Sequence, residues 1–396
     1  MSSDRERPAT AGRSAPSLAL LIAVTMTGTV ALHIFIPALP AAARDLGTSP
    51  AAIQLTITLY LIGLAVGQLI YGPISDRLGR RPVIIASLAL YLAGIVLAIP
   101  AATIGWLVAA RVLQSVGACG ALVLGRAMVR DVSTNEDAAK KLAVLIACMT
   151  LTPSLAPGIG GLIETWFGWR AIFVALAAVV GALTLIVVLT LPETHPPSGA
   201  ESGINSAFSG YRRLMRSAKF RRYTLAGSCA GTSLYAFLSV APFLYIDVLH
   251  RSGQEVGLYC VIVSLGMAAG AAMVRFMVGR MEIRRGARLG NLVSFAGAAL
   301  LLAAHLSGEL SVATLTGTML LYALGIGIGG PNMVAGAMGV DPEAAGSASG
   351  LYGFSQMAVG ALATLAVGLW HDGSALPLAV VLIMASLTTA LMLQRV

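Results

Sequence analysis

Long apolar runs separated by short polar segments recur along the whole chain. A membrane-spanning helix needs about 20 apolar residues, because each residue rises about 1.5 Å along the helix axis. Runs of roughly this length cover residues 18–39, 53–71, 83–101, 104–128, 142–163, 171–191, 223–246, 256–277, 289–305, 312–338, 345–369 and 376–393. The pattern predicts an all-α polytopic membrane protein with twelve transmembrane helices.

The composition agrees with a membrane protein and argues against a soluble enzyme. Of the 396 residues, 57% are hydrophobic and 11% are charged, whereas a soluble domain typically has about 25% charged residues. The four cysteines lie singly within apolar runs, so neither a disulfide nor a metal site is expected. The chain has no Walker sequence, which argues against direct drive by ATP. We expect no cofactor and no enzymatic activity.

Basic residues are distributed unevenly among the polar segments. Of the 26 Lys and Arg residues, Arg111 lies well inside a run, and Arg44, Arg170 and Arg251 lie in one set of alternate segments. The remaining 22 lie in the other set or at the ends of the runs that border it. The positive-inside rule then places both termini in the cytoplasm of a multi-pass cell-membrane protein. Because the basic residues are scattered over loops, a nucleic-acid partner is not expected.

The first run has an alternative interpretation as a cleavable signal peptide. Arg13 precedes the run, and small residues from Ala41 to Ala43 follow it. Cleavage would leave eleven runs and would break the alternation of charge. We therefore treat the first run as a membrane-spanning helix.

The longest polar interval follows the sixth run and divides the chain. It predicts an N-terminal six-helix half at residues 1–191, a cytoplasmic central loop at 192–222 and a C-terminal six-helix half at 223–396. A shift of 204 residues aligns Arg284 and Arg285 with Arg80 and Arg81, which is a weak internal repeat.

The charged segment GPISDRLGRRP separates the second and third runs. It contains Gly72, Asp76, Arg77, Gly79, Arg80 and Arg81. Asp76, at a helix end, can accept hydrogen bonds from a neighbouring helix, and Arg80 and Arg81 can tie the two halves together. Anchoring of the topology by positive charge would explain the arginines but not the acid and the two glycines.

This segment resembles the signature G-x-x-x-D-R-x-G-R-R of the major facilitator superfamily. RVLQSVGA from Arg111 is similar to the fourth-helix motif R-x-x-Q-x-x-G-A, and TPSLAPGIGG from Thr152 is similar to the fifth-helix motif of drug:proton antiporters. HIFIPALP from His33 and FGWRAIF from Phe167 resemble the bicyclomycin and chloramphenicol exporter group (Bcr/CflA). The resemblance implies two halves that alternate access, with the charged segment as a latch made in one conformation and broken in the other.

Arg111 is a candidate functional residue because it lies inside an apolar run. An arginine at the centre of a membrane helix costs about 2.5–3.5 kcal/mol, so a specific role is expected. Gln114 lies three residues further on the same helix face, which predicts a polar stripe facing the bundle interior. The alternative is a side chain that snorkels about 10 Å to the outer surface.

Proton coupling needs a titrating group, and none of the 17 acidic residues falls in the middle of a run. Related exporters usually carry an acid where this chain has His33. Histidine has a suitable unperturbed pKa of about 6.5. We predict coupling through His33 and Arg111, with Asp247 as the alternative group. If neither serves, the protein is a facilitator.

Two further runs contain clustered glycine and proline. Pro153, Pro157, Gly158, Gly160 and Gly161 predict a bent helix that packs closely against a helix of the other half. Gly325, Gly327 and Gly330 form a formal G-x-G-x-x-G within a run, where no strand precedes it. A flexible tenth span is expected there rather than a dinucleotide loop.

The expected substrate cavity lies between the halves and is lined by aromatic, amide and charged side chains. The predicted lining residues are Tyr60, Arg111, Gln114, Tyr235, Phe237, Tyr245, Asn332, Tyr352 and Gln356. Such a lining suits amphipathic solutes. With the resemblance, it predicts a monomeric exporter in the lipid bilayer that exchanges a chloramphenicol- or bicyclomycin-like small molecule for protons. The alternatives are an exporter or facilitator of a sugar, nucleoside or other metabolite, and a membrane sensor or scaffold without transport.

Overall fold

Long helices build the protein throughout the part of the chain that the structure describes. The computed structural model describes residues 16–195, 203–277, 280–341, 345–370 and 372–395. Its elements are α1 (Leu18–His33), η1 (Ile36–Ala38), α2 (Leu39–Asp45), α3 (Pro50–Leu78), α4 (Arg80–Ala98), α5 (Ile104–Asp131), α6 (Asn135–Phe167), α7 (Trp169–Thr190), α8 (Gly203–Arg216), α9 (Ala218–Phe243), η2 (Leu244–Val248), α10 (Gly253–Met277), α11 (Ile283–Leu306), α12 (Val312–Met338), α13 (Ala345–Leu369) and α14 (Leu376–Gln394). No strand occurs in these ranges, and the predicted all-α fold is confirmed.

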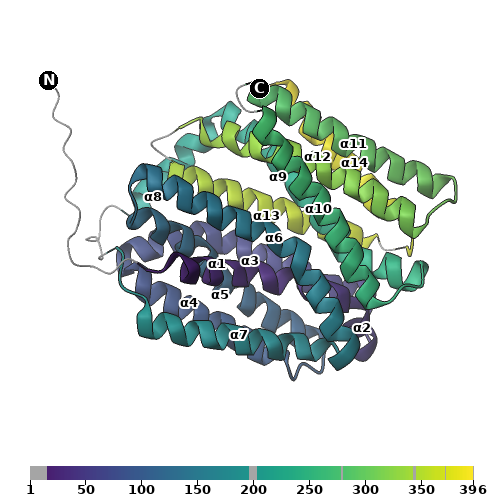
Figure 1. Cartoon of the computed structure of the whole chain (residues 1–396), viewed down its shortest axis with the longest axis horizontal. Helices are drawn as coiled ribbons and strands as arrows, with labels where there is room; N and C mark the ends of the chain where they lie inside the picture. Colours follow the sequence, from purple (N-terminus) through teal and green to yellow (C-terminus); the bar gives the residue numbers. More distant parts are fainter. Residues whose placement is uncertain (1–15, 196–202, 278–279, 342–344, 371, 396) are drawn as a thin grey trace.

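The predicted membrane spans correspond to long helices. Among the described residues, eleven helical segments are long and apolar enough to cross a membrane. The 33-residue helix α6 contains the remaining predicted run. In Figure 1 these helices lie alongside one another, as a membrane bundle requires. Leu189 and Leu369 expose 72% and 77% of their surfaces, as expected for side chains that face lipid.

The first predicted run is divided between α1, the 3₁₀ turn η1 and α2. Pro37 lies in η1, and Pro40 lies at the start of α2. Proline has no N–H, so Pro37 cannot bond to the carbonyl of His33 four residues earlier, and the regular helix ends. The break places His33 at the end of α1.

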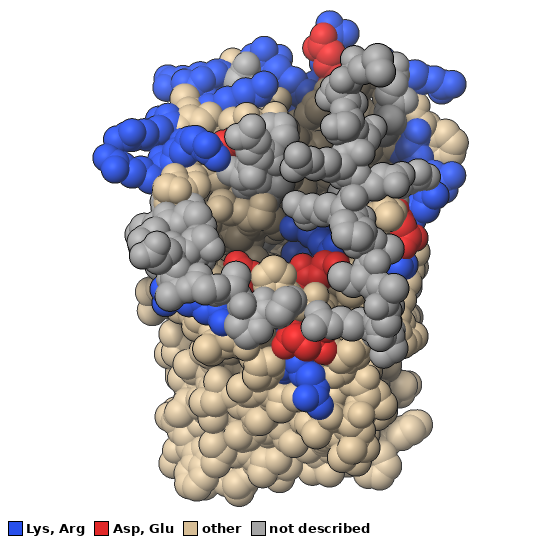
Figure 2. All heavy atoms as spheres, turned by 90° about the vertical axis from the view of Figure 1, so that its left-hand side faces the viewer, with Lys and Arg blue, Asp and Glu red and all other residues tan. Residues whose placement is uncertain are grey.

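The bundle has two ends that differ in charge. We call the end where α3 meets α4 the basic end, and the end where α2 meets α3 the far end. Figure 2 looks onto the basic end and shows Lys and Arg side chains gathered there around a hollow. Helix α3 packs along α13, and α6 packs along α10. These two pairs join the first six long helices to the last six.

The interval predicted as the central loop contains a helix. Helix α8 covers Gly203–Arg216 at the basic end and packs on α3, α9 and α13. Leu214 of α8 is buried against Phe220 and Tyr223 in an apolar cluster that accounts for this docking. The sequence pattern had missed this helix, because its apolar face is short and its other residues are mainly polar or basic.

The glycines of α12 lie at close contacts with neighbouring helices, and the flexibility expected of this span stays a prediction. A Cβ on Gly327 would lie 2.9 Å from Cα of Gly270 in α10. A Cβ on Gly290 of α11 would lie 2.6 Å from the carbonyl oxygen of Gly325. Glycine therefore lets the backbones of α10, α11 and α12 approach within contact distance.

Candidate transport site

The side chain of Arg111 is completely buried within the first six long helices. It projects from α5, and its Nη1 donates to the carbonyl oxygen of Ala31 in α1 at 3.1 Å and to Oε1 of Gln114 at 2.6 Å. This placement excludes the alternative of a side chain that snorkels to the outer surface.

Aromatic rings enclose the guanidinium of Arg111. Its Cζ lies 4.3 Å from the ring centroid of Tyr60 and 5.4 Å from that of Phe35. The hydroxyl of Tyr60 donates to the carbonyl of Gly28 at 2.8 Å, which fixes the ring. A cation over an aromatic face gains about 2 kcal/mol or more when it is desolvated. The rings therefore offset part of the cost of burying this charge.

Several donors in the Arg111 cluster lack a hydrogen-bond partner among the described residues. In the described part of the chain, Nε and Nη2 of Arg111 and Nε2 of Gln114 are buried and have no hydrogen-bond partner. The ion pairs seen among these residues do not include Arg111. Unpartnered buried N–H groups are costly. The arrangement can thus receive an acceptor oxygen from a bound solute.

His33 lies where the two sets of six long helices meet. It is 2% exposed, and its ring centroid lies 6.0 Å from that of Tyr235 in α9. Its Nδ1 lies 2.7 Å from the carbonyl oxygen of Thr29. A carbonyl can only accept, so Nδ1 carries the hydrogen and Nε2 of the neutral ring is left as an acceptor.

Asp247, the alternative coupling residue, lies at the far end in η2. Its side chain is half exposed, and Oδ1 lies 3.6 Å from Nη1 of Arg44. This pair links α2 to η2 across the far end. An exposed pair of this kind contributes about 0–1 kcal/mol.

The other predicted lining residues do not gather into one cavity. Phe237 and Tyr245 are fully buried, and the hydroxyl of Tyr245 lies 2.7 Å from Oγ1 of Thr316. Asn332 faces α11 and donates to the carbonyl of Ile328 in its own helix at 2.8 Å. Tyr352 and Gln356 both face glycines of α9. The predicted single cavity lined by all nine residues is therefore corrected to the Arg111 cluster and separate packing positions.

The charged segment at residues 72–81 is bonded within the N-terminal part of the chain. Arg80 pairs with Asp76 at 2.6 Å and with Asp131 of α5 at 2.9 Å. Glu193 accepts from the backbone N–H groups of Arg80 and Arg81 at 2.8 and 3.1 Å. The predicted bridge from Arg80 and Arg81 to the C-terminal half is absent from the described residues. In this structure these two arginines brace α3, α4, α5 and the end of α7.

Gly79 explains why a glycine is needed between α3 and α4. Its φ of +92° is a conformation that residues with a side chain rarely adopt. A Cβ there would also lie 2.6 Å from Oε2 of Glu193. The sharp turn lets the first N–H groups of α4 reach this carboxylate.

Removal of the Arg80 side chain should destabilise the protein. Arg80→Ala would leave Asp131, which is 16% exposed, without its cation, at a cost of roughly 3 kcal/mol. Arg81→Ala is the matched control, because Arg81 is exposed and its side chain donates to the carbonyl of Val188 at 2.9 Å. We expect a clearly lower Tm in detergent for Arg80→Ala alone. Equal Tm values for the two variants would contradict this role.

The fifth-helix motif lies in α6 against α10. The carbonyl of Pro153 accepts from the hydroxyl of Ser264 at 3.1 Å. A Cβ on Gly161 would lie 2.6 Å from the carbonyl oxygen of Gly253, and one on Gly257 would lie 2.8 Å from that of Pro157. The motif thus sits at close backbone contact between the two sets of helices.

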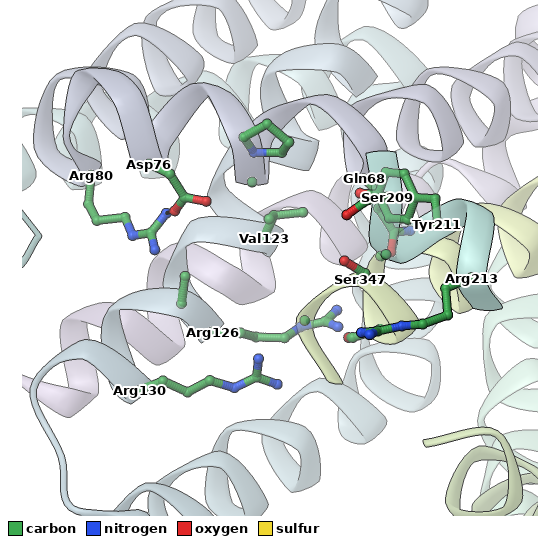
Figure 3. A pocket seen from close by; sticks show the side chains of 17 residues that line it. Gln68, Asp76, Arg80, Val123, Arg126, Arg130, Ser209, Tyr211, Arg213 and Ser347 are labelled. Carbon is green, nitrogen blue, oxygen red and sulfur yellow. Dashed lines mark ion pairs between the residues drawn. The ribbon is translucent and has the colours of Figure 1, made fainter. Parts of the chain in front are cut away.

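A pocket of about 510 Å³ opens at the basic end between α3, α5, α8 and α13. Gly72, Asp76 and Arg80 line it, together with Gln68, Pro73, Val123, Arg126, Ala127, Arg130, Ser209, Gly210, Tyr211, Arg213, Gly346, Ser347, Ser349 and Gly350. Figure 3 shows Arg126 and Arg130 projecting from one helix and Arg213 from another. The sequence alone does not single out this group, because arginines beside apolar runs are typical topology signals. The spacing of four between Arg126 and Arg130 was the available clue.

Comparison with known proteins identifies the family. The model of the Major Facilitator Superfamily matches residues 18–364. The chain is 30% identical to multidrug resistance protein D of Escherichia coli over 370 residues, which cover 91% of each chain. It is 30% identical to the chloramphenicol resistance protein of Pseudomonas aeruginosa over 373 residues, which cover 92% of this chain and 87% of the relative. The crystal structure of a D-xylose-proton symporter matches with a TM-score of 0.74 at 14% identity, covering 94% of this chain and 96% of that one. The predicted resemblance is confirmed, and the chain belongs to the major facilitator superfamily.

Proposed function

We propose that this transporter exports a small amphipathic, drug-like molecule in exchange for protons, across a cell membrane in which both of its termini face the cytoplasm. One observation carries the choice of drugs as cargo. Relatives named for multidrug and chloramphenicol resistance are similar to more than nine-tenths of this chain.

Alternating access is supported by the contrast between the two ends. Near the far end, Thr58 of α3 and Thr364 of α13 lie with their hydroxyl oxygens 2.9 Å apart, and α6 contacts α10 through glycines. At the basic end, a pocket of about 510 Å³ opens between α3, α5, α8 and α13. The contrast supports a carrier that is open towards the side of its basic loops, ready to take up a solute there.

The Arg111 cluster supports binding of a polar group of the cargo. Nε and Nη2 of Arg111 and Nε2 of Gln114 offer three donors, while Tyr60 and Phe35 offer aromatic surface. A solute with an acceptor oxygen and an apolar body fits both features. The cluster is closed in this structure, so access to it requires a rearrangement of the helices around α1.

His33 is the proposed proton carrier. It lies two residues along α1 from Ala31, whose carbonyl binds Arg111, and it also faces Tyr235 of the other set of helices. Movement of α1 against α9 would change its surroundings. None of the described ion pairs places a carboxylate on Arg111, so no buried acid is seen there that could carry a proton in place of His33. A facilitator, which needs no proton carrier, is therefore the second candidate.

Drug tolerance distinguishes these functions. Expression of the chain in a host without its own efflux pumps should raise tolerance to chloramphenicol-like compounds, and an uncoupler should abolish the effect. Inverted membrane vesicles should accumulate labelled drug when energised. Accumulation limited to equilibration and insensitive to the uncoupler would indicate a facilitator. A sensor or scaffold would move nothing.

The variant His33→Gln should uncouple transport from protons. One proton driven by 100 mV supplies about 2.3 kcal/mol, or roughly a fortyfold gradient of an uncharged drug. In energised vesicles we expect this ratio to fall towards one, while exchange of labelled for unlabelled drug continues. His305→Gln, in α11, is the matched control and should behave as the parent. A gradient retained in His33→Gln would exclude His33 as the coupling group.

A further inference from the structure

The pocket at the basic end carries an excess of positive charge. Arg126 and Arg130 lie four residues apart on α5 and share one helix face, and Arg213 reaches the pocket from α8. Figure 3 shows the ends of Arg126 and Arg213 extending towards each other, with Arg130 on the same side as Arg126. Like charges at this spacing destabilise a helix. A compensating anion is therefore expected nearby.

The acids among the described lining residues do not supply that anion. Asp76 pairs with Arg80, which also binds Asp131, and Arg213 pairs with Asp341 at 2.8 Å. Arg126 and Arg130 take part in none of the ion pairs within the described ranges. In addition, Nε of Arg126 is buried and lacks a hydrogen-bond partner there. Among the described residues, these two guanidinium groups thus have no carboxylate partner.

The remaining surface of the pocket is suited to an anionic group. Gln68 of α3 and Ser347 and Ser349 of α13 bring neutral donors to the same space. The volume of about 510 Å³ is that of a small-molecule site. Guanidinium forks bind carboxylates and phosphates through paired, charge-assisted hydrogen bonds.

We propose that this pocket binds the carboxylate or phosphate group of an organic anion that enters at the basic end. The proposal rests on the transport function above and adds solutes that bear an anionic group to its substrate class. The site is separate from the Arg111 cluster, because Arg111, Gln114 and Tyr60 do not line the pocket. It would act as a first recognition site, where the anion bridges α5 and α8.

Binding can be measured without transport. The full-length protein in phosphatidylcholine nanodiscs would be titrated calorimetrically with benzoate and phenyl phosphate, and with benzamide as the neutral match of benzoate. We expect both anions to bind roughly tenfold tighter than benzamide, or more, as one charge-assisted hydrogen bond allows. High salt should weaken the binding of the two anions and leave the affinity for benzamide unchanged. Equal affinity of benzoate and benzamide would overturn the proposal.

Variants test which arginines act. Arg126→Gln and Arg130→Gln should each lower the affinity for the anions roughly tenfold. Arg126→Lys keeps the charge and should lower the affinity less than Arg126→Gln does. Arg212→Gln removes the same charge from an exposed position of α8 outside the pocket and should have no effect. Arg130 is exposed, so its variant keeps the test valid if Arg126→Gln fails to fold. Equal losses in Arg130→Gln and Arg212→Gln would overturn the proposal.

Two further outcomes identify the source of the anion. A lipid headgroup in the pocket would have two signs. Benzoate would bind more weakly in nanodiscs with added phosphatidylglycerol, and lipid would copurify with the parent but not with Arg126→Gln. Both results together would overturn the proposal of a soluble anion. Glu343 lies outside the described residues. If benzoate bound only to the Glu343→Gln variant, an acid of the chain itself would be the partner of the arginines, and the proposal of a soluble anion would be overturned. Drug efflux is measured independently, so its failure and the failure of anion binding are distinguishable.

Discussion

Replacement of Arg111 by methionine is expected to abolish drug transport and leave the fold at least as stable as before. The guanidinium is fully buried and pairs with no acid in the described part of the chain. Methionine fills a similar volume without a charge, and such replacements of buried charges are often neutral or stabilising. Transport should fall about a hundredfold or more, since two charge-assisted hydrogen bonds are worth at least about 1.5 kcal/mol each.

The measurement pairs initial rates of uptake into inverted vesicles with Tm in detergent. Arg111→Lys is the informative companion, because it keeps the charge and loses the planar set of donors. We expect it to retain a small part of the activity. Transport by Arg111→Met within threefold of the parent would remove Arg111 from the mechanism. Lost activity together with a much lower Tm would indicate a structural role only.

Adjacent glycines in α6 should give opposite defects when changed to valine. A Cβ at position 161 meets the carbonyl oxygen of Gly253 in α10, at 2.6 Å, whereas one at position 160 meets the carbonyl oxygen of Ile34, just after α1. The contact of Gly161 joins the two sets of six helices and should be lost when the far end opens. The contact of Gly160 lies within one set and should persist in both conformations.

Gly161→Val should therefore fold normally and remain open at the far end. Overpacking costs about 1–3 kcal/mol, which shifts the equilibrium between conformations roughly 5- to 150-fold. Gly160→Val should instead lower Tm and the yield of folded protein. Gly181→Val of α7 is the control, because a Cβ there meets nothing within 4 Å.

Spin labels can measure the distance between α6 and α10 at the far end. Labels at Phe167 of α6 and Leu258 of α10, in a background without the native cysteines, should move apart in Gly161→Val and stay close in Gly181→Val. Both positions are exposed, at 73% and 55%, so the labels fit without repacking. An unchanged distance in Gly161→Val, with normal transport, would show that α6 and α10 do not separate.

The apolar runs predicted the spans well, because hydrocarbon imposes length and composition on every membrane helix. The interruption at Pro37 and the helix α8 were missed, since both depend on a few local residues. The buried position of Arg111 beside Gln114 was predictable, because a cation within an apolar run is costly wherever it packs. Tyr352 and Asn332 were misplaced, because the identity of a residue does not reveal which neighbouring helix its face meets. The partners of Arg80 and the grouping of Arg126 with Arg213 likewise depend on tertiary contacts.

The close glycine contacts of Gly270, Gly290, Gly325 and Gly327 have a mechanical consequence. Backbones that touch directly leave no compressible side-chain layer between them, so α10, α11 and α12 can neither slide nor bend independently. They must turn together as a solid block. In the proposed alternating-access cycle, the displacement would then be concentrated where α3 contacts α13 and where α6 contacts α10.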